Sequence, residues 1–249
     1  MVAVIAGASK GIGFSFVKRL LETTDMPIIA ASRNKRAFEA NMARSNSNWS
    51  ARVKFVEMDV SNEETIRSAA ERIKKIHGDR CVRLHVQCAG YLRPEKSLRA
   101  IDVDEAFQHF RINAVGPMLV AKHFHSLLAL HSSATSPFRH SVWINLSART
   151  GSIGDNRLGG WHSYRMSKAS LNQLTKTMSV ELQRRGSIVV SMHPGTVNTD
   201  LSRDFVKNVD PNKLFTADDS VEKMMDVIRK LGPDDNGKFL DYAGKPIPW

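Results

Sequence analysis

The sequence predicts an α/β fold, a single doubly wound domain in which a parallel seven-stranded sheet is covered by helices on both faces. Short apolar runs typical of buried strands alternate with helical patterns from one end of the chain to the other, with no linker and no internal repeat. The length of 249 residues fits one generous domain better than two small ones, so we expect residues 1–249 to form one domain.

The strands are predicted from short apolar runs that end at turn-forming residues. The first run ends at a glycine-rich turn, and the sixth is stopped by Pro194-Gly195. The predicted strands are Val2–Ala6, Pro27–Ala31, Val53–Met58, Val82–Val86, Ser141–Leu146, Ile188–Met192 and Lys238–Tyr242.

The helices are predicted from apolar residues at helical spacing between these runs. Asn62–Ile76 begins with a polar cap and two glutamates in its first turn, which is typical of a helix start. We expect Val103–Leu128 to bend or break around Gly116-Pro117, because proline disrupts a helix interior. The predicted helices are Gly11–Leu21, Lys35–Arg44, Asn62–Ile76, Val103–Leu128, Ser163–Arg185 and Val221–Leu231.

The charge balance, 36 basic and 25 acidic residues, gives a net charge of +11 and raises the possibility of nucleic-acid binding. The basic residues are scattered, however, and there is neither zinc-finger spacing nor an aromatic-rich basic strand, so solvated helix faces are the favoured interpretation. No metal-ligand spacing is present, and we expect no metal, no nucleic-acid partner and no membrane span. The glycine turn begins at residue 7, which leaves no room for a leader peptide, and two cysteines cannot build a disulfide framework. A cytoplasmic protein is therefore expected.

Gly7, Gly11 and Gly13 lie where the first strand should turn into the first helix. Glycines there allow positive φ and let the backbone approach a diphosphate at the helix N-terminus. The spacing is G-x-x-x-G-x-G rather than G-x-G-x-x-G, and the Gly-Lys-Ser/Thr ending of a P-loop is missing. A tight turn alone would also use glycine, but the position after the first strand favours a dinucleotide site.

Two cations indicate which dinucleotide is bound. The second strand ends at Ser32-Arg33, where an NAD-selective site would carry an acid for the ribose 2′-hydroxyl. Arg33 and Lys10 would instead attract a 2′-phosphate. Each could be an ordinary surface cation, but together, with the acid missing, they favour NADP(H).

Tyr164 and Lys168 lie four residues apart on a predicted helix, so their side chains share one face. We expect the ammonium to sit beside the phenol and to lower the pKa of Tyr164 from about 10, which favours proton transfer closer to neutral pH.

With these motifs in order, the chain resembles the short-chain dehydrogenase/reductase family over essentially its full length. The resemblance rests on Gly7-x3-Gly11-x-Gly13, Asp59-Val60, Cys88-Ala89-Gly90, Asn113, Tyr164-x3-Lys168 and Pro194-Gly195-x-Val197-x-Thr199. The stretches from Gly159 to Ala169 and from Gly237 to Trp249 are similar to the C-factor-like (C-signal) branch of this family.

The resemblance implies a Rossmann-type fold and a role for each matching residue. Tyr164 would be the acid/base, Lys168 would hold the nicotinamide ribose and tune Tyr164, and Asn113 would anchor a water that relays protons to Lys168. Asp59-Val60 would contact adenine, and Val197 with Thr199 would hold the carboxamide and phosphates. The residues expected to bind the cofactor are Gly7, Ser9, Lys10, Gly11, Ile12, Gly13, Arg33, Asp59, Val60, Ala89, Gly90, Tyr164, Lys168, Pro194, Val197 and Thr199.

Two positions depart from the family pattern. Cys88 replaces the usual asparagine, and we interpret it as a small core residue rather than a reactive thiol. Ala148 stands where the family has the serine that binds the substrate carbonyl. Ser147 is the first candidate to replace it, provided that the strand has ended or bulged there, since neighbouring strand residues face opposite sides. Ser152 is the second candidate, and low activity is expected if neither reaches the site.

The polar stretch Thr196–Thr216 follows Pro194-Gly195 and is predicted to form a substrate lid. The apolar side chains of this stretch, together with Trp161 before Tyr164, indicate an apolar substrate pocket. The alternative is that they only pack the lid against the rest of the protein.

These observations predict an NADP(H)-dependent oxidoreductase of the carbonyl reductase type, which transfers a hydride between nicotinamide and a small carbonyl or alcohol substrate. The alternative is a nucleotide-binding signalling or interaction protein with little turnover, which Ala148 supports and the complete Tyr164, Lys168 and Asn113 set argues against. Family members commonly pair through the helices that bear Asn113 and Tyr164, so the resemblance implies a homodimer or homotetramer.

Overall fold

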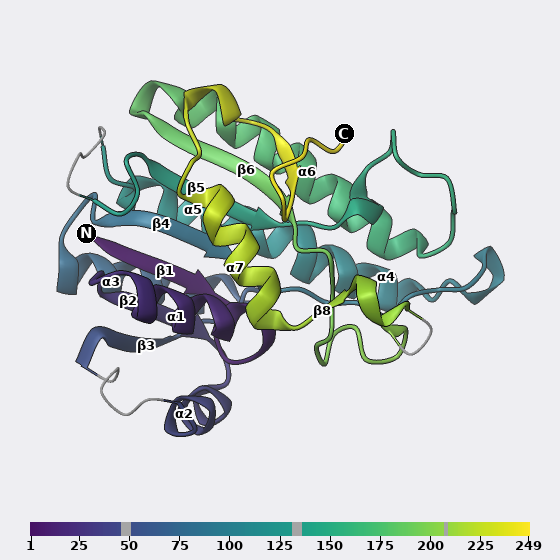
Figure 1. Cartoon of the computed structure of the whole chain (residues 1–249), viewed down its shortest axis with the longest axis horizontal. Coiled ribbons are helices and arrows are strands. Elements are labelled where there is room, and N and C mark those ends of the chain that lie inside the picture. The colour runs from purple at the N-terminus through teal and green to yellow at the C-terminus, as the bar shows by residue number, and fades with distance from the viewer. Residues whose placement is uncertain (46–50, 131–135, 207–208) are drawn as a thin grey trace.

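The computed structural model of the chain describes residues 1–45, 51–130, 136–206 and 209–249. Seven parallel strands form one sheet in the order β3-β2-β1-β4-β5-β6-β9, which confirms the predicted sheet (Figure 1). Its strands are β1 (Val2–Ala6), β2 (Ile28–Ser32), β3 (Val53–Glu57), β4 (Val82–Gln87), β5 (Ser141–Leu146), β6 (Ser187–His193) and β9 (Phe239–Asp241). Two short strands that were not predicted, β7 (Thr196–Val197) and β8 (Leu214–Phe215), pair with each other at the two ends of the predicted lid.

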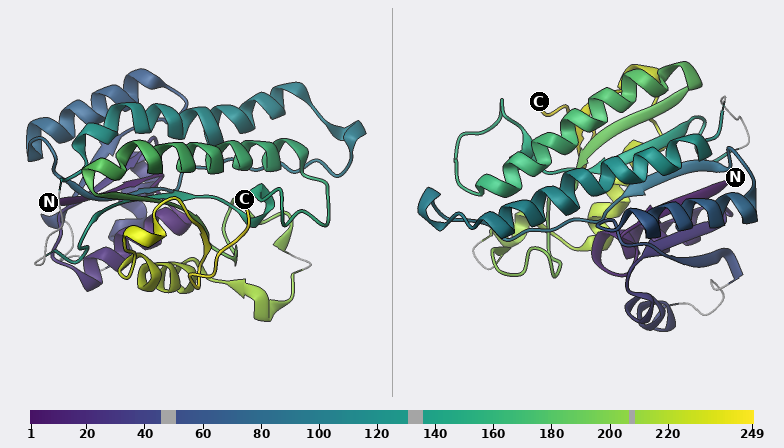
Figure 2. Two further views of the ribbon diagram at one scale, coloured as in Figure 1. Left: turned by 90° about the horizontal axis from the view of Figure 1, so that it is seen from above. Right: turned by 180° about the vertical axis from the view of Figure 1, so that it is seen from behind.

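Helices cover both faces of the sheet (Figure 2). One layer consists of α3 (Glu63–His77), α4 (Val103–Phe110), α5 (Gly116–Phe124) and α6 (His162–Leu182). The other consists of α1 (Gly11–Thr23), α2 (Lys35–Ala43) and α7 (Ala217–Ile228). This arrangement is the doubly wound one that the sequence predicts.

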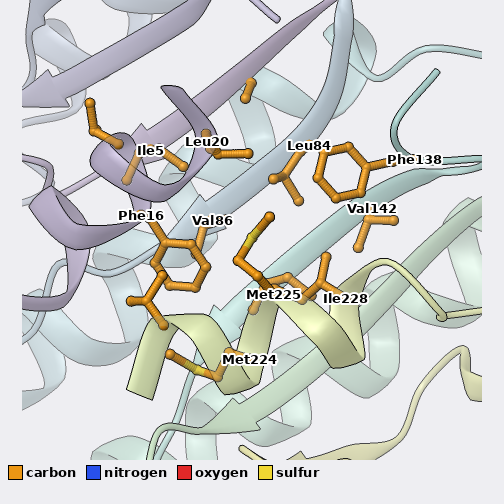
Figure 3. Close-up of a cluster of buried hydrophobic side chains, with 14 of the residues drawn as sticks. Ile5, Phe16, Leu20, Leu84, Val86, Phe138, Val142, Met224, Met225 and Ile228 are labelled. Carbon is orange, nitrogen blue, oxygen red and sulfur yellow. The ribbon is translucent and has the colours of Figure 1, made fainter. Parts of the chain in front are cut away.

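Alternation along each strand divides the apolar side chains between two cores. In β1, Ala3 and Ile5 join the core beneath α1 and α7, whereas Val2, Val4 and Ala6 join the core beneath α3, α5 and α6. Figure 3 shows the first core, in which Phe16 packs near Met224 and Met225 of α7. Because strands buried on both faces need apolar residues at every position, they appear in the sequence as continuous apolar runs.

The strand order reverses between β1 and β4, which are adjacent in the sheet although β2 and β3 lie between them in the sequence. In open α/β sheets a ligand cleft forms at such a reversal, outside the carboxyl ends of the strands. The turn after β1 and the segment after β4 therefore meet at this edge, where most of the predicted site residues lie.

The helix expected over Val103–Leu128 does not break at Gly116-Pro117. A π-helical segment, Arg111–Val115, joins α4 to α5, and the N–H of Gly116 bonds to the carbonyl of Arg111. Pro117 has no N–H, and its ring would collide with the carbonyl four residues earlier in a regular α-helix, so a wider turn accommodates it without a break.

The predicted start of the last helix, Val221, is wrong by one turn. Helix α7 begins at Ala217, because Thr216 accepts a bond from the N–H of Asp219 while the Asp219 carboxylate accepts one from Thr216 in return. This capping box stabilises the polar first turn, and its cap residue, Thr216, is the last residue of the predicted lid.

Candidate functional site

The glycine turn after β1 has backbone that only glycine accommodates easily. Gly7 has a φ of +85°, and a Cβ placed on it would lie 2.6 Å from the backbone nitrogen of Ala89. A Cβ on Gly13 would lie 2.2 Å from the carbonyl oxygen of Gly7. The turn is thus packed directly against the segment that follows β4, at the strand-order reversal.

The N-terminus of α1 is suited to an anion. Its cap residue, Lys10, makes no side-chain capping bond, and the first turn contains no acid. The first N–H groups of a helix need acceptors and attract negative charge. The close glycine packing and the uncapped helix together fit the diphosphate of a dinucleotide. Ser9 contributes a carbonyl that accepts a 2.8 Å bond from Asn41, which ties α2 to the turn.

The two cations predicted to recognise a 2′-phosphate each lie beside an acid. Arg33 is 67% exposed just after β2, with Nη1 3.9 Å from Oδ2 of Asp59. Lys10 pairs at 2.7 Å with Asp200 in the predicted lid. Both cations are exposed, as a phosphate-binding role requires, and Val60 beside Asp59 is buried.

The environment keeps Asp59 ionised. Burial raises the pKa of this carboxyl, but hydrogen bonds from the N–H and hydroxyl of Ser61 and the charges of Arg33 and Arg111 outweigh burial and lower it below its ordinary value.

Helix α6 brings Tyr164 and Lys168 together on its sheet-facing side. Both are buried, and the Lys168 ammonium lies 5.8 Å from the centroid of the Tyr164 ring. The ammonium donates a 2.8 Å hydrogen bond to the carbonyl of Leu146 at the end of β5.

The protonation of this pair differs from the prediction. Burial raises the pKa of the Tyr164 phenol, and the lowering expected from Lys168 is not seen. Burial also lowers the pKa of Lys168 to about 8, against a small opposing effect of Cys88. Desolvation is therefore the largest influence on both groups, because burial disfavours the charged form of each.

Asn113 lies in the π-helical segment, beside the same group. A Cβ on Gly90 would lie 3.5 Å from Oδ1 of Asn113 and 3.9 Å from Nζ of Lys168, so these three residues meet. The Asn113 side chain accepts a 2.8 Å bond from the N–H of Tyr91 and donates bonds of 2.8 Å to the Tyr91 carbonyl and 3.0 Å to Ser167. The amide thus fastens the segment after β4 to the π-helical segment and to Ser167 of α6.

The two candidate serines differ in their surroundings. Ser152 is held in the structure, since its hydroxyl donates a 2.5 Å bond to the carbonyl of Pro248 and accepts a 3.0 Å bond from the N–H of Asp155. The Ser147 hydroxyl is buried and makes no hydrogen bond within the described residues. The Ser147 N–H bonds to Met192, so the strand pairing continues past the end of β5 without a bulge. Strand alternation then directs Ser147 to the same side as Asn145, which bonds to Thr175 of α6, and away from the side of Ala148. The condition under which Ser147 was expected to replace the family serine is therefore not met.

The start of the predicted lid lies against the glycine turn. A Cβ on Gly11 would lie 3.4 Å from the methyl carbon of Thr199, and Val197 is buried nearby in the chain. Pro194 accepts a 2.6 Å bond from Ser220 of α7, which anchors the base of the lid. Phe205 packs edge-on to Trp161 at 4.9 Å, next to the start of α6. Positions 207 and 208 of the lid lie outside the described residues.

The sequence gives no indication of the contacts made by Tyr91, His109 and Glu95. The Nε2 atom of His109 accepts a 3.1 Å bond from the N–H of Arg93, and the Glu95 carboxylate accepts bonds from the N–H of Ser163. The one available signal was the alternating spacing of Tyr91, Arg93 and Glu95 after β4. This spacing does not show which residues they contact unless the positions of α4 and α6 are known.

Within the described ranges, no cluster of three or more His, Cys, Asp or Glu side chains could hold a metal ion. Among the helices described, none is long and apolar enough to cross a membrane.

Known proteins share the sequence pattern and the fold of this chain. The family model described as short chain dehydrogenase matches residues 1–210. An uncharacterized oxidoreductase of Schizosaccharomyces pombe is 32% identical over 100% of this chain and 98% of its own length. The C-signal protein of Myxococcus xanthus is 36% identical over 61% of this chain and 84% of its own length.

Two solved structures have a similar fold over the whole chain. The NADPH-bound carbonyl reductase from chicken fatty liver has a TM-score of 0.87 and 27% identity, covering 100% of this chain and 98% of that one. The carbonyl reductase Sniffer of Drosophila melanogaster has a TM-score of 0.85 and 28% identity, covering 100% of this chain and 99% of that one.

Proposed function

The chain belongs to the short-chain dehydrogenase family of oxidoreductases, and from this premise we propose that it is an NADP(H)-dependent carbonyl reductase. The observation that carries the proposal is the buried Tyr164–Lys168 pair, which meets Asn113 and Gly90 beside the glycine turn. A binding protein has little need for a phenol and an ammonium buried together beside the glycine turn.

The proposed cofactor-binding residues lie at or near the carboxyl edge of the sheet, where the turn after β1 meets the segment after β4. Gly7, Gly11, Gly13 and the first N–H groups of α1 would hold the diphosphate, with Ser9 and Ile12 completing the turn. Lys10 and Arg33 would contact the 2′-phosphate, and Asp59-Val60 the adenine. Ala89, Gly90, Pro194, Val197 and Thr199 would line the nicotinamide half. NADPH, when bound, would supply the hydride that reduces the carbonyl carbon.

The residues of the chain would supply the proton and the positioning. The Tyr164 phenol, whose raised pKa keeps it protonated near neutral pH, would donate its proton to the carbonyl oxygen as negative charge develops there. The charged Lys168 would stabilise the resulting phenolate and hold the ribose. Of the two candidate serines, Ser147 has the uncommitted hydroxyl within the described residues. Because it faces away from the side of Ala148, it would share the charge of the carbonyl oxygen only if the backbone turns there.

The test is the loss of NADPH absorbance when purified protein meets a panel of aldehydes, ketones and quinones. Tyr164→Phe should lower kcat by roughly 10²- to 10⁴-fold, the range typical of general acid catalysis. The Kd for NADPH should change little, since the phenol is one of many expected cofactor contacts. NADPH oxidation by Tyr164→Phe at the wild-type rate would refute the assignment of Tyr164.

The second candidate, a nucleotide-binding signalling protein with little turnover, is favoured by Ala148 at the serine position and by the similarity to C-signal. Tight NADPH binding without turnover on any carbonyl would support it. Nucleic-acid binding through the net charge of +11 is the least supported reading, and it would require binding that weakens steeply with salt.

We also propose a homodimer or homotetramer in the cytoplasm. Apolar side chains stand exposed on the helices that would pair, notably Phe107 on α4, Met118 on α5, and Met166 and Val180 on α6. Light scattering of the purified protein would give the state of association.

A further inference from the structure

The segment that follows β4, residues 91–95, is bonded to three parts of the helical layer, and we name it the strap. Its first residue, Tyr91, bonds through both backbone groups to Asn113 at 2.8 Å. The N–H of Arg93 bonds to His109 of α4 at 3.1 Å. Glu95 reaches α6, where its carboxylate accepts bonds of 3.2 and 3.3 Å from the N–H of Ser163 and its carbonyl accepts a 3.0 Å bond from the N–H of Trp161.

Helix α6 begins without a cap of its own. Its cap residue, Trp161, has φ 54° and ψ 44°, a left-handed conformation that is strained for a tryptophan. It makes no side-chain capping bond, and the first turn contains no acid. The N–H groups of a first turn need acceptors and favour negative charge, and the Glu95 carboxylate, from 68 positions earlier, supplies both.

Glu95 is buried, and its environment stabilises the charged form. Burial raises the pKa of its carboxyl, but hydrogen bonds from the side chain and backbone of Ser163 lower it more, so the group remains a carboxylate. The raised pKa of Tyr164 arises from burial alone, so Glu95 acts on the phenol by position rather than by charge.

The Tyr164 ring is packed between two side chains that the strap holds. His109 and Trp161 each lie edge-on to it, with centroids 6.1 Å away. His109 is fixed by the N–H of Arg93, and Trp161 by the carbonyl of Glu95. Tyr164 itself follows Ser163, the residue that the Glu95 carboxylate binds.

Resting on the proposed function, we propose that Glu95 is a positioning residue for Tyr164: by holding Ser163 and the strained turn at Trp161, it fixes the orientation of the phenol toward a bound carbonyl. The strap thereby ties Asn113 and Tyr164, two of the predicted catalytic residues, into one unit.

The experiment compares Glu95→Ala and Glu95→Gln with Asn62→Ala, which removes the cap of α3 at a distance from the strap. Glu95→Ala should lower kcat by roughly 10- to 100-fold, because small displacements of a reacting group are costly, with the Kd for NADPH unchanged. Glu95→Gln keeps an acceptor oxygen and should restore most of kcat. Asn62→Ala should lower the melting temperature and leave kcat near wild type.

A second measurement does not depend on turnover. The chain has three tyrosines, and ring-labelled tyrosine gives one NMR signal for each, with that of Tyr164 assigned by Tyr164→Phe. Glu95→Ala should shift the Tyr164 signal, and Glu95→Gln should leave it nearly in place. If Glu95→Ala does not fold, Glu95→Asp, which shortens the reach by one methylene, takes its place with the same expectation.

An unchanged kcat and an unchanged Tyr164 signal in Glu95→Ala would overturn the proposal, as would equal losses in Glu95→Ala and Glu95→Gln. A wild-type protein without turnover would refute the proposed function instead, and the Tyr164 signal would then decide the role of Glu95 alone.

Discussion

The ammonium of Lys168 donates a 2.8 Å hydrogen bond to the carbonyl oxygen of Leu146, which ties the middle of α6 to the end of β5. A carbonyl can share a charged donor but cannot neutralise it, so Lys168 remains a buried cation with a pKa lowered to about 8 by burial. The position and the pKa of this one group lead to two measurable consequences.

The first consequence is an alkaline limit on activity. Since Lys168 loses its proton above about pH 8, the support it gives to the Tyr164 phenolate should disappear there, and kcat for carbonyl reduction should fall as pH rises through that value. The pH profile of kcat measures this, with Lys168→Arg as the control, because arginine keeps its charge. A profile for the wild type that stays flat through this range would contradict the role given to Lys168.

The second consequence concerns stability. Folding lowers the pKa of Lys168 from 10.5 to about 8, so between these values the unfolded chain binds more protons than the folded one, and stability rises with pH. Below about pH 8 the buried charge costs up to roughly 3 kcal/mol, from 1.36 kcal/mol per unit of pKa. Lys168→Met should therefore unfold at higher urea concentration than wild type at neutral pH, and the advantage should vanish as pH approaches 10.5. A variant that is less stable than wild type at neutral pH would show that the bond to Leu146 outweighs the burial cost.

Gly13→Ala should destabilise the protein by about 2–3 kcal/mol and abolish NADPH binding, because its Cβ would lie 2.2 Å from the carbonyl oxygen of Gly7. The gain in helix propensity, about 1 kcal/mol, is too small to compensate. The matched control is Gly232→Ala, where a Cβ would meet no atom within 4 Å and no positive φ is required. Urea unfolding of both variants measures the difference, and equal stabilities would disprove the tight packing of the turn.

Substitutions of the two serines should show which serine stabilises the fold and which takes part in the reaction. Ser152→Ala removes the bonds to Pro248 and Asp155 and should cost about 1–3 kcal/mol of stability with little change in kcat. Ser147→Ala should instead lower kcat with little loss of stability, since its hydroxyl makes no bond within the described residues. Ala148→Ser restores the hydroxyl of the family pattern and should raise kcat. The reverse result, with kcat lost only in Ser152→Ala, would exchange the two roles.

Arg33→Ala should reduce the preference for NADPH over NADH by roughly 10- to 100-fold. This range corresponds to the loss of one charge-assisted bond between Arg33 and the 2′-phosphate, worth about 1.5–3 kcal/mol. The expected change is a higher KM for NADPH with the KM for NADH unchanged. Arg72→Ala, which removes an exposed arginine from α3, is the control for the loss of one positive charge. An equal effect of both variants would mean that Arg33 acts only through net charge.

The fold was predictable because its signals are local. Continuous apolar runs such as Val2–Ala6 identify strands buried on both faces, and the alternation with helices leaves a parallel sheet as the solution. The glycine turn and the Tyr164–Lys168 pair were predictable for the same reason, since each depends on spacing within one element. The roles of these residues remain predictions.

The remaining features depend on contacts between distant parts of the chain. Spacing places Lys168 beside Tyr164, but only the buried environment shows that desolvation governs both pKa values. The bond between Glu95 and Ser163 depends on how α6 meets the segment after β4. The π-helical segment at Asn113 is a local feature, but Gly116-Pro117 predicts only that the helix is disturbed there, not that one turn widens.

Strand β1, which lies between β2 and β4 in the sheet, is the first strand to be synthesised but gains its second neighbour late. Val2–Ala6 leaves the ribosome before every other strand, yet its second neighbour, β4, ends only at Gln87. Until more than a third of the chain has been synthesised, the five apolar residues of β1 can pair only with β2. The other edge of β1 stays open and can pair with a wrong strand. Production of this protein should therefore depend on slow translation or on chaperones that shield nascent chains.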